Sequence, residues 1–357
     1  MTPDQDSAIP NGPLVAFPTQ PAGVPWPDSG WPIRPDAPGA LGPLVDAMFG
    51  DPSRFGTTYA VVVVHEGSVV AERYGGALPN WSGPDTEVTP DTPLLSWSIA
   101  KSITHAAVGV LGRDGRLDLA APAPVPAWSD DARSAITIDH LLQMRDGLAF
   151  VEDYVDDGVS NVIEMLFGRG RDDVAAYAAA RPLANAPGAV FNYSSGTSNI
   201  VARVVGDVVG GGEAGLRRFL VGELFDCIGM GSADPRFDAS ETFVGSSYVY
   251  ATARDFARFG LLYLRGGVWD DTRILPESWV DHARLPRSVD ATDGRLYGAH
   301  WWVVGDEFGS FWASGYEGQM LVCVPVLDLV IARFGRTDAS LGPNLYEWRA
   351  HVTEAFL

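Results

Sequence analysis

Lysine is almost absent from this sequence, because of its 25 basic residues only Lys101 is a lysine. Everywhere else arginine supplies the positive charge. Arginine keeps its proton in a protein, whereas a buried lysine can lose one. Lys101 is therefore a candidate for a task that needs a neutral amine. An ordinary exposed lysine is the alternative, and the neighbouring residues must decide between the two.

Cysteine and histidine are scarce as well. Cys227 and Cys323 lie far apart in apolar contexts, which predicts two reduced core residues rather than a disulfide framework. The six histidines show no H-E-x-x-H or comparable spacing, so we expect no metal and no cofactor. His105 lies on a predicted helix, and we expect its side chain to pack against neighbouring residues rather than to act as a base. A G-x-S-x-G motif is also missing, which removes the usual signature of an α/β-hydrolase.

Long apolar runs and an excess of positive charge are missing too. No segment approaches the roughly 18–20 consecutive apolar residues of a membrane span. The formal charge of −20 disfavours binding to nucleic acid or to an anionic membrane surface. The first thirty residues lack the basic and apolar regions of a secretion signal. We therefore expect a cytoplasmic protein that acts on a small molecule, with its oligomeric state left open.

The pattern of apolar residues predicts strands at both ends of the chain and helices between them. A hairpin is expected at 59–73, where two β-branched runs flank a glycine-containing turn. Apolar spacings of three and four residues indicate helices in the middle. The expected later strands are 296–304, 311–325 and 327–334, and the expected helices are 38–50, 97–111, 137–144, 172–180, 198–209, 214–224, 252–265 and 343–356.

This order of elements favours an α+β fold. We expect an antiparallel sheet assembled from both chain ends and flanked by helices, plus a helical lobe. In this prediction residues 1–37 form an extended, proline-rich arm, residues 38–114 and 291–357 form the α/β lobe, and residues 115–290 form the mainly helical lobe. A cleft between the two lobes is the expected place for a site.

Ser98-Ile99-Ala100-Lys101 forms an S-x-x-K element at the start of a predicted helix. Residues three apart share one face of a helix, so the Lys101 amine can approach the Ser98 hydroxyl. The positive end of the helix dipole and burial both disfavour the ammonium form. A neutral Lys101 could then take the proton of Ser98, which makes Ser98 the candidate nucleophile. Chance alone can supply such a spacing, so further motifs are needed.

Tyr193-Ser194-Ser195 follows a polar turn just before another predicted helix. With the S-x-x-K element, it resembles the serine β-lactamase and penicillin-binding-protein superfamily in its class C and esterase branch. The resemblance covers about 58–356. It implies a β-lactamase/transpeptidase-like fold in which Tyr193 relays the proton of Ser98 to the leaving group. Ser195 stands at the third position of the tyrosine motif, where asparagine is commoner.

The third motif of this superfamily is altered here. Ala313-Ser314-Gly315-Tyr316 stands where the superfamily has a K-T-G or H-x-G strand. The resemblance implies that Ser314 hydrogen-bonds at the site and that the Tyr316 backbone N–H pairs with that of Ser98 as an oxyanion hole. Ala313 replaces the usual cation or imidazole, a common partner for a substrate carboxylate. We therefore expect an esterase or amidase rather than a β-lactamase.

The run from Glu152 to Asp157 reads E-D-Y-V-D-D and resembles the 6-aminohexanoate-dimer hydrolase group. In that group the loop tyrosine reaches the scissile amide of a linear substrate, which implies a binding role for Tyr154. The carboxylates of the run could equally form a solvated acidic loop. The expected function is a serine hydrolase that cleaves a carboxylic ester or linear amide through an acyl-enzyme. β-Lactamase or D-amino-acid peptidase activity, or a catalytically silent binding role, are the alternatives.

Overall fold

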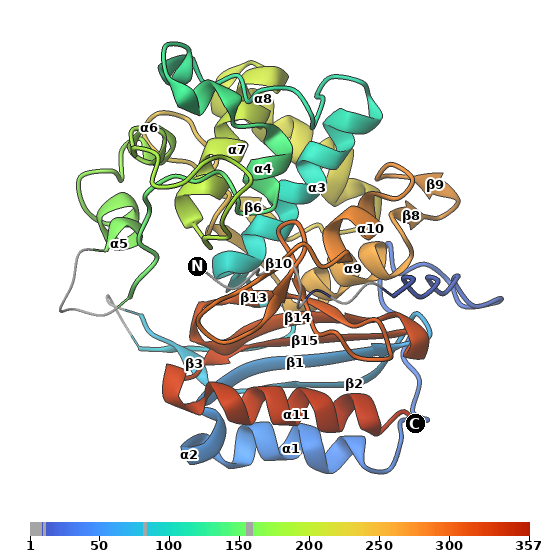
Figure 1. The fold of residues 1–357 in the computed structure, drawn as a ribbon. Coiled ribbons are helices and arrows are strands. Elements are labelled where there is room, and N and C mark those ends of the chain that lie inside the picture. The colour runs from blue at the N-terminus through green and yellow to red at the C-terminus, as the bar shows by residue number, and fades with distance from the viewer. Residues whose placement is uncertain (1–8, 10–11, 81–83, 155–159) are drawn as a thin grey trace.

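The computed structural model describes residue 9 and residues 12–80, 84–154 and 160–357 of the 357. An eight-stranded antiparallel sheet forms its centre, with helices on both faces (Figure 1). In spatial order the strands are β10 (Ser288–Val289), β11 (Leu296–Tyr297), β12 (Trp302–Val303), β13 (Phe311–Gly315), β14 (Gln319–Val324), β15 (Leu329–Arg336), β1 (Thr57–His65) and β2 (Ser68–Tyr74).

The sheet joins the two ends of the chain. The hairpin β1–β2 comes from the N-terminal part, and β10 to β15 come from the C-terminal part. They meet where β1 pairs with β15, with Val63 opposite Ile331. This arrangement confirms the predicted α+β class and the sheet built from both ends. The predicted lobe boundaries stay predictions.

Strand β1 is buried on both faces, which explains its unbroken run of valines. Val61 and Val63 face one apolar layer, which they share with Leu41 of α1 (Leu41–Gly50) and Trp348 of α11 (Gly342–Glu354). Their neighbours along the strand face the opposite layer, which they share with residues of α3 (Ala100–Arg113) and α9 (Ala253–Leu264). Successive strand side chains point to opposite faces, so one strand serves two cores.

Helices α1 and α11 cover one face of the sheet, and the remaining longer helices lie on the other face (Figure 1). Their bounds are α1 (Leu41–Gly50), α2 (Pro52–Phe55), α3 (Ala100–Arg113), α4 (Ile138–Leu142), α5 (Asn161–Leu166), α6 (Val174–Ala179), α7 (Ser195–Val209), α8 (Gly212–Leu220), α9 (Ala253–Leu264), α10 (Trp279–Arg284) and α11 (Gly342–Glu354). The helices α2, α5 and α10 have no counterpart among the predicted ones.

Three small sheets complete the described part of the chain. Their strands are β3 (Ala77–Leu78) with β4 (Thr86–Glu87), β5 (Leu94–Leu95) with β7 (Val249–Ala251) and β6 (Asp234–Pro235), and β8 (Val268–Trp269) with β9 (Thr272–Arg273). The pairing of β5 with β7 matters most for the site, because β5 leads into the turn that carries Ser98.

Two of the predicted strands are wrong in length. The stretch 296–304 is a tight hairpin of β11 and β12, because Gly298 turns close to Ala283 and His300 has a φ of 54°. The stretch 311–325 is also a hairpin. Glu317 and Gly318 have φ values of 61° and 76°, which a continuous strand does not allow, and they reverse the chain between β13 and β14.

The prediction of a core position is wrong for one of the two cysteines. Cys323 is buried on β14, whereas Cys227 is exposed.

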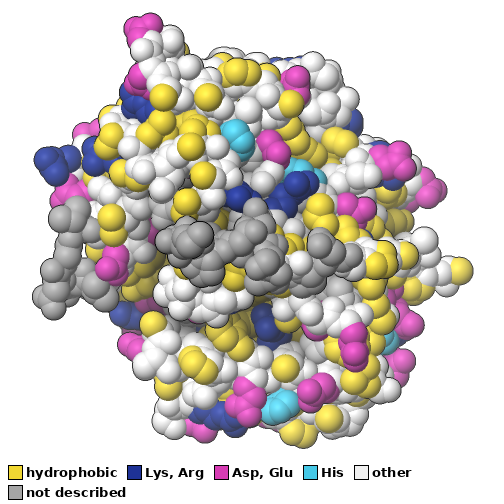
Figure 2. Space-filling view, viewed as in Figure 1, with side chains coloured by type: hydrophobic (Ala, Val, Ile, Leu, Met, Phe, Trp, Pro, Cys, Tyr) yellow, Lys and Arg dark blue, Asp and Glu magenta, His cyan; other side chains and the backbone are white. Residues whose placement is uncertain are grey.

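Figure 2 shows acidic and basic side chains interspersed with apolar ones on the face turned to the viewer. Within the described ranges, no helix is long and apolar enough to cross a membrane.

Candidate active site

Ser98 lies in a 3-10 turn, η2 (Trp97–Ile99), directly before α3. Ser96 anchors this turn, because its hydroxyl donates to the backbone oxygen of Ser247 at 3.1 Å. Trp97 has a φ of 44°, a left-handed conformation that bulky residues seldom adopt. Such a backbone persists only where its surroundings hold it. The turn presents Ser98 at the wall of a cavity.

Lys101 is the second residue of α3, and only 1% of it is exposed. Its Nζ lies 2.9 Å from Ser98 Oγ, 2.9 Å from Ser195 Oγ and 3.1 Å from the backbone oxygen of Ser246. Burial lowers the pKa of Lys101 to about 8, although the Glu152 carboxylate acts in the opposite direction. The neutral amine that the S-x-x-K hypothesis requires is therefore accessible near pH 8.

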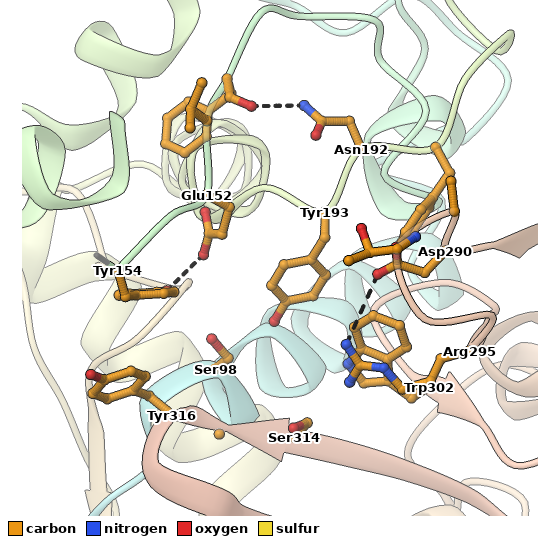
Figure 3. A pocket seen from close by; sticks show the side chains of 16 residues that line it. Ser98, Glu152, Tyr154, Asn192, Tyr193, Asp290, Arg295, Trp302, Ser314 and Tyr316 are labelled. Carbon is orange, nitrogen blue, oxygen red and sulfur yellow. Dashed lines mark hydrogen bonds and ion pairs between the residues drawn. The ribbon is translucent and has the colours of Figure 1, made fainter. Parts of the chain in front are cut away.

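Tyr193 stands on the other side of this pair. Its ring stacks on Trp302, with the ring centres 5.3 Å apart, and Lys101 Nζ lies 4.9 Å from the ring centre. Figure 3 shows the Tyr193 hydroxyl turned toward Ser98. Burial, and then the charge of Glu152, raise the pKa of Tyr193. The phenol therefore keeps its proton at neutral pH and can both donate and accept a hydrogen bond.

Ser195 is the first residue of α7, after the helix cap Ser194. It is fully buried and bridges two charged groups. Its Oγ accepts a hydrogen bond from Lys101 and donates one to Glu152 Oε1 at 2.5 Å. Its backbone N–H donates to Glu152 Oε2 at 2.7 Å. The predicted third member of the tyrosine motif thus contacts the lysine and not the cavity.

Glu152 is the site residue that sequence reasoning left undecided. The same Oε1 also accepts a hydrogen bond from the Tyr154 hydroxyl at 2.8 Å, so the carboxylate has three donors and is not a solvated loop group. The Tyr154 ring stacks on Tyr316, with 4.9 Å between the ring centres. Burial raises the pKa of Tyr154. Residues 155–157 of the acidic run lie outside the described residues.

The end of β13 forms the floor of the cavity. Ser314, Gly315 and Tyr316 all line it, whereas Ala313 is buried in the core beneath. A Cβ on Gly315 would lie 2.8 Å from the backbone oxygen of Ser96. Glycine at this position therefore lets the strand approach the turn that carries Ser98.

The cavity has a volume of about 570 Å³ and opens between the sheet and the helices (Figure 3). One wall comes from the turn between β10 and β11, which contributes Asp290 and Arg295. The Arg295 guanidinium lies 4.0 Å from the centre of the Trp302 ring, and its Nε donates to Asp293 at 2.6 Å. These charged residues belong to no motif, so nothing in the sequence pointed to them.

The histidines lie away from this constellation. His105 is fully buried and contacts the Tyr263 hydroxyl at 2.8 Å and His282 at 3.2 Å, in agreement with its predicted packing inside a helix. Among the described residues, no three His, Cys, Asp or Glu side chains are placed to hold a metal ion.

A family comparison agrees with this geometry. The model of the Beta-lactamase family matches residues 56–353 of the sequence. The chain belongs to the Beta-lactamase family. It is therefore a serine hydrolase, and the resemblance inferred from the three motifs is confirmed.

The chain is similar to proteins that are named as amide and ester hydrolases. The chain is 27% identical over 299 residues to a 6-aminohexanoate-dimer hydrolase of Paenarthrobacter ureafaciens, covering 77% of this chain and 72% of the relative. A candidate 6-aminohexanoate-dimer hydrolase from Bacillus anthracis has a similar fold, with a TM-score of 0.71 at 24% identity and coverage of 96% and 88%. A family VIII carboxylesterase gives a TM-score of 0.67 at 16% identity, with coverage of 88% and 98%.

Proposed function

We propose that this protein hydrolyses carboxylic esters or linear amides through an acyl-enzyme on Ser98. The observation that carries the proposal is the buried Lys101 amine, which lies 2.9 Å from Ser98 Oγ and has a pKa lowered to about 8. An amine of this kind is partly neutral near physiological pH and can act as a general base.

In the first half-reaction Ser98 Oγ attacks the substrate carbonyl while its proton passes to Lys101 Nζ. The negative charge that develops on the carbonyl oxygen is stabilised by the backbone N–H groups of Ser98 and Tyr316. Tyr193 then relays the proton to the leaving alkoxide or amine, and the C–O or C–N bond breaks. Water hydrolyses the acyl-enzyme by the same route in reverse.

The substrate class is inferred from two features of the cavity. Ala313 supplies no cation or imidazole at the strand position where related enzymes commonly bind a carboxylate, which disfavours β-lactam recognition. Tyr154 stands at the rim of the cavity, where its hydroxyl could meet the amide of a linear substrate. The relative named as a 6-aminohexanoate-dimer hydrolase supports a linear amide as one such substrate.

Fluorophosphonate labelling followed by mass spectrometry tests the nucleophile. We expect one covalent adduct on Ser98 in the wild-type protein and none in Ser98→Ala. Labelling that persists unchanged in Ser98→Ala would show that Ser98 is not the nucleophile and would contradict the proposal. Failure of every acyl substrate, together with no label on the wild-type protein, would favour a binding role instead.

A panel of substrates separates the activities that remain. We propose to compare p-nitrophenyl esters, a linear aminohexanoate dimer, a D-amino-acid peptide and a chromogenic cephalosporin under one set of conditions. Turnover of the esters or the dimer with no cleavage of the cephalosporin is the expected result.

The cytoplasmic location also stays a prediction, which fractionation of the native host can check.

A further inference from the structure

The Lys101 amine has three oxygen neighbours, and its lone pair can point toward only one of them. A neutral amine has two N–H bonds and one lone pair, yet Nζ lies within hydrogen-bond distance of Ser98 Oγ, Ser195 Oγ and the Ser246 carbonyl oxygen. Only an amine whose lone pair faces Ser98 can take the proton of that hydroxyl. Two of the three contacts must therefore accept hydrogen bonds from Lys101.

The Ser246 carbonyl can only accept. The Ser195 hydroxyl could in principle donate its hydrogen to the amine lone pair, which would compete with Ser98. Its hydrogen is taken by Glu152 instead, because an ionised carboxylate is acceptor-only and Oε1 lies 2.5 Å from Ser195 Oγ. Ser195 is then left with lone pairs toward Lys101.

We propose that Glu152 is a positioning residue that orients the Ser195 hydroxyl and thereby aims the Lys101 lone pair at Ser98. This inference rests on the proposed function, since it assumes that Lys101 is the base. It assigns a task to the acidic residue of the loop and explains why Ser195 is buried against Lys101 rather than exposed in the cavity. Glu152 acts through Ser195 and does not itself touch the reacting atoms.

The variant Glu152→Gln tests the proposal because an amide cannot reproduce the contacts of the carboxylate. With its oxygen at the Oε1 position, the NH₂ group would face the Ser195 backbone N–H. With the NH₂ group at that position, it would donate to Ser195 Oγ and turn that hydroxyl toward Lys101. Either arrangement disturbs the base, so we expect the rate of fluorophosphonate labelling to fall by roughly ten- to a hundredfold.

The pH dependence provides a signature that a merely structural role would not produce. The groups around the amine are the Ser98, Ser195 and Ser246 oxygens, the Tyr193 ring, the Glu152 charge and buried His300, whose pKa burial lowers to about 3. Among the residues that the structure describes, Glu152 is the negative charge that raises the pKa of Lys101. Removing it should move the midpoint of the labelling profile to lower pH, while Asp290→Asn, a matched loss of charge in the same cavity, should not.

A double-mutant cycle decides whether the effect passes through Ser195. In a Ser195→Ala background, Glu152→Gln should cost less than about threefold in labelling rate, because the hydroxyl that it orients is gone. An equal cost in both backgrounds would overturn the proposal. A cost that vanishes only in a Tyr154→Phe background would also overturn it, since Glu152 would then act through the loop.

A conservative variant and two controls keep the outcomes distinct. Glu152→Asp keeps the charge, so its pH midpoint should stay near that of the wild type while its rate falls. Thermal unfolding of each variant separates misfolding from misorientation. If the wild-type protein takes no label, or if Ser98→Ala takes the same label, the proposed function fails; if the wild type is labelled on Ser98 and Glu152→Gln matches it in rate and midpoint, only this inference fails.

Discussion

Lys101 Nζ lies 2.9 Å from Ser98 Oγ, and only 1% of the lysine is exposed. Burial at this depth disfavours a charged ammonium. A neutral amine beside a hydroxyl can act as a general base toward it. The scarcity of lysine elsewhere fits this view. Arginine serves wherever the protein needs a permanent charge, and lysine remains at the position where the charge has to be removable.

The first prediction follows from that difference. Lys101→Arg keeps the positive charge but cannot act as a base, so we expect kcat/KM for p-nitrophenyl esters to fall by at least roughly a hundredfold. Steady-state kinetics at pH 8 measure the effect. Arg217→Lys, which swaps the same two residue types at a partly exposed ion pair, is the matched control. Near wild-type hydrolysis by Lys101→Arg would show that another group is the base.

The second prediction concerns the cost of burying the lysine. Its pKa is 10.5 when unperturbed and about 8 in the folded protein, so between these values the unfolded chain binds more protons than the folded one. Stability should therefore rise with pH from about 8 to 10.5, by at most about 3 kcal/mol from this group.

The variant Lys101→Met isolates this contribution because it removes the titrating group. We expect its melting temperature relative to the wild type to be highest below pH 8 and to decline as the pH rises toward 10.5, since the wild type alone gains stability there. Calorimetry across this range measures the difference. A gap that stays constant with pH would mean that the folded lysine has no lowered pKa. Activity should show the same midpoint, with kcat/KM rising as the pH increases through about 8.

The sequence predicted those parts of the site that depend on local spacing. Ser98 and Lys101 share a helix face, and Tyr193 precedes a capped helix, so short-range patterns sufficed. The role of Glu152 could not be read in this way, because its contacts with Ser195 and Tyr154 depend on how a loop folds onto α7. Arg295 owes its place in the cavity to a turn between two short strands.

The fold shows the same division. The two β-branched runs at 59–73 predicted the hairpin β1–β2, and the sheet built from both ends followed from the order of elements. The stretches 296–304 and 311–325 were each predicted as one strand, and each contains a reversal of the chain. Their turns depend on positive φ at His300 and Glu317, residue types that mark a turn less clearly than glycine does.

The third prediction tests the approach of β13 to the turn that carries Ser98. Gly315→Ala places a Cβ 2.8 Å from the backbone oxygen of Ser96 and 3.0 Å from the Gln319 Cβ. Either the Ser96 backbone or β13 itself must move, so we expect a loss of roughly 1–3 kcal/mol in the free energy of unfolding. We also expect kcat to fall, because the displaced strand carries half of the proposed oxyanion hole.

A glycine without such neighbours serves as the control. Gly42 lies in α1, and a Cβ there would meet nothing within 4 Å. Gly42→Ala should therefore leave kcat unchanged and change the free energy of unfolding by less than about 1 kcal/mol, because alanine favours a helix while the following Pro43 restricts it. Denaturant unfolding and ester kinetics on both variants make the comparison. If Gly315→Ala behaved like Gly42→Ala, the close packing of β13 on the Ser98 turn would have no bearing on catalysis.

The fourth prediction separates amide from ester hydrolysis. Tyr154→Phe can keep the stack on Tyr316 but removes the hydroxyl that bonds to Glu152 and stands at the rim of the cavity. An amide nitrogen leaves only with a proton and benefits from a hydrogen bond, whereas p-nitrophenolate leaves as a stable anion. We expect kcat/KM to fall roughly tenfold for a linear aminohexanoate dimer and less than about threefold for a p-nitrophenyl ester. Tyr250→Phe, which removes a hydroxyl outside the cavity, should change neither rate. Equal losses on both substrates would assign Tyr154 to the shape of the loop rather than to contact with an amide.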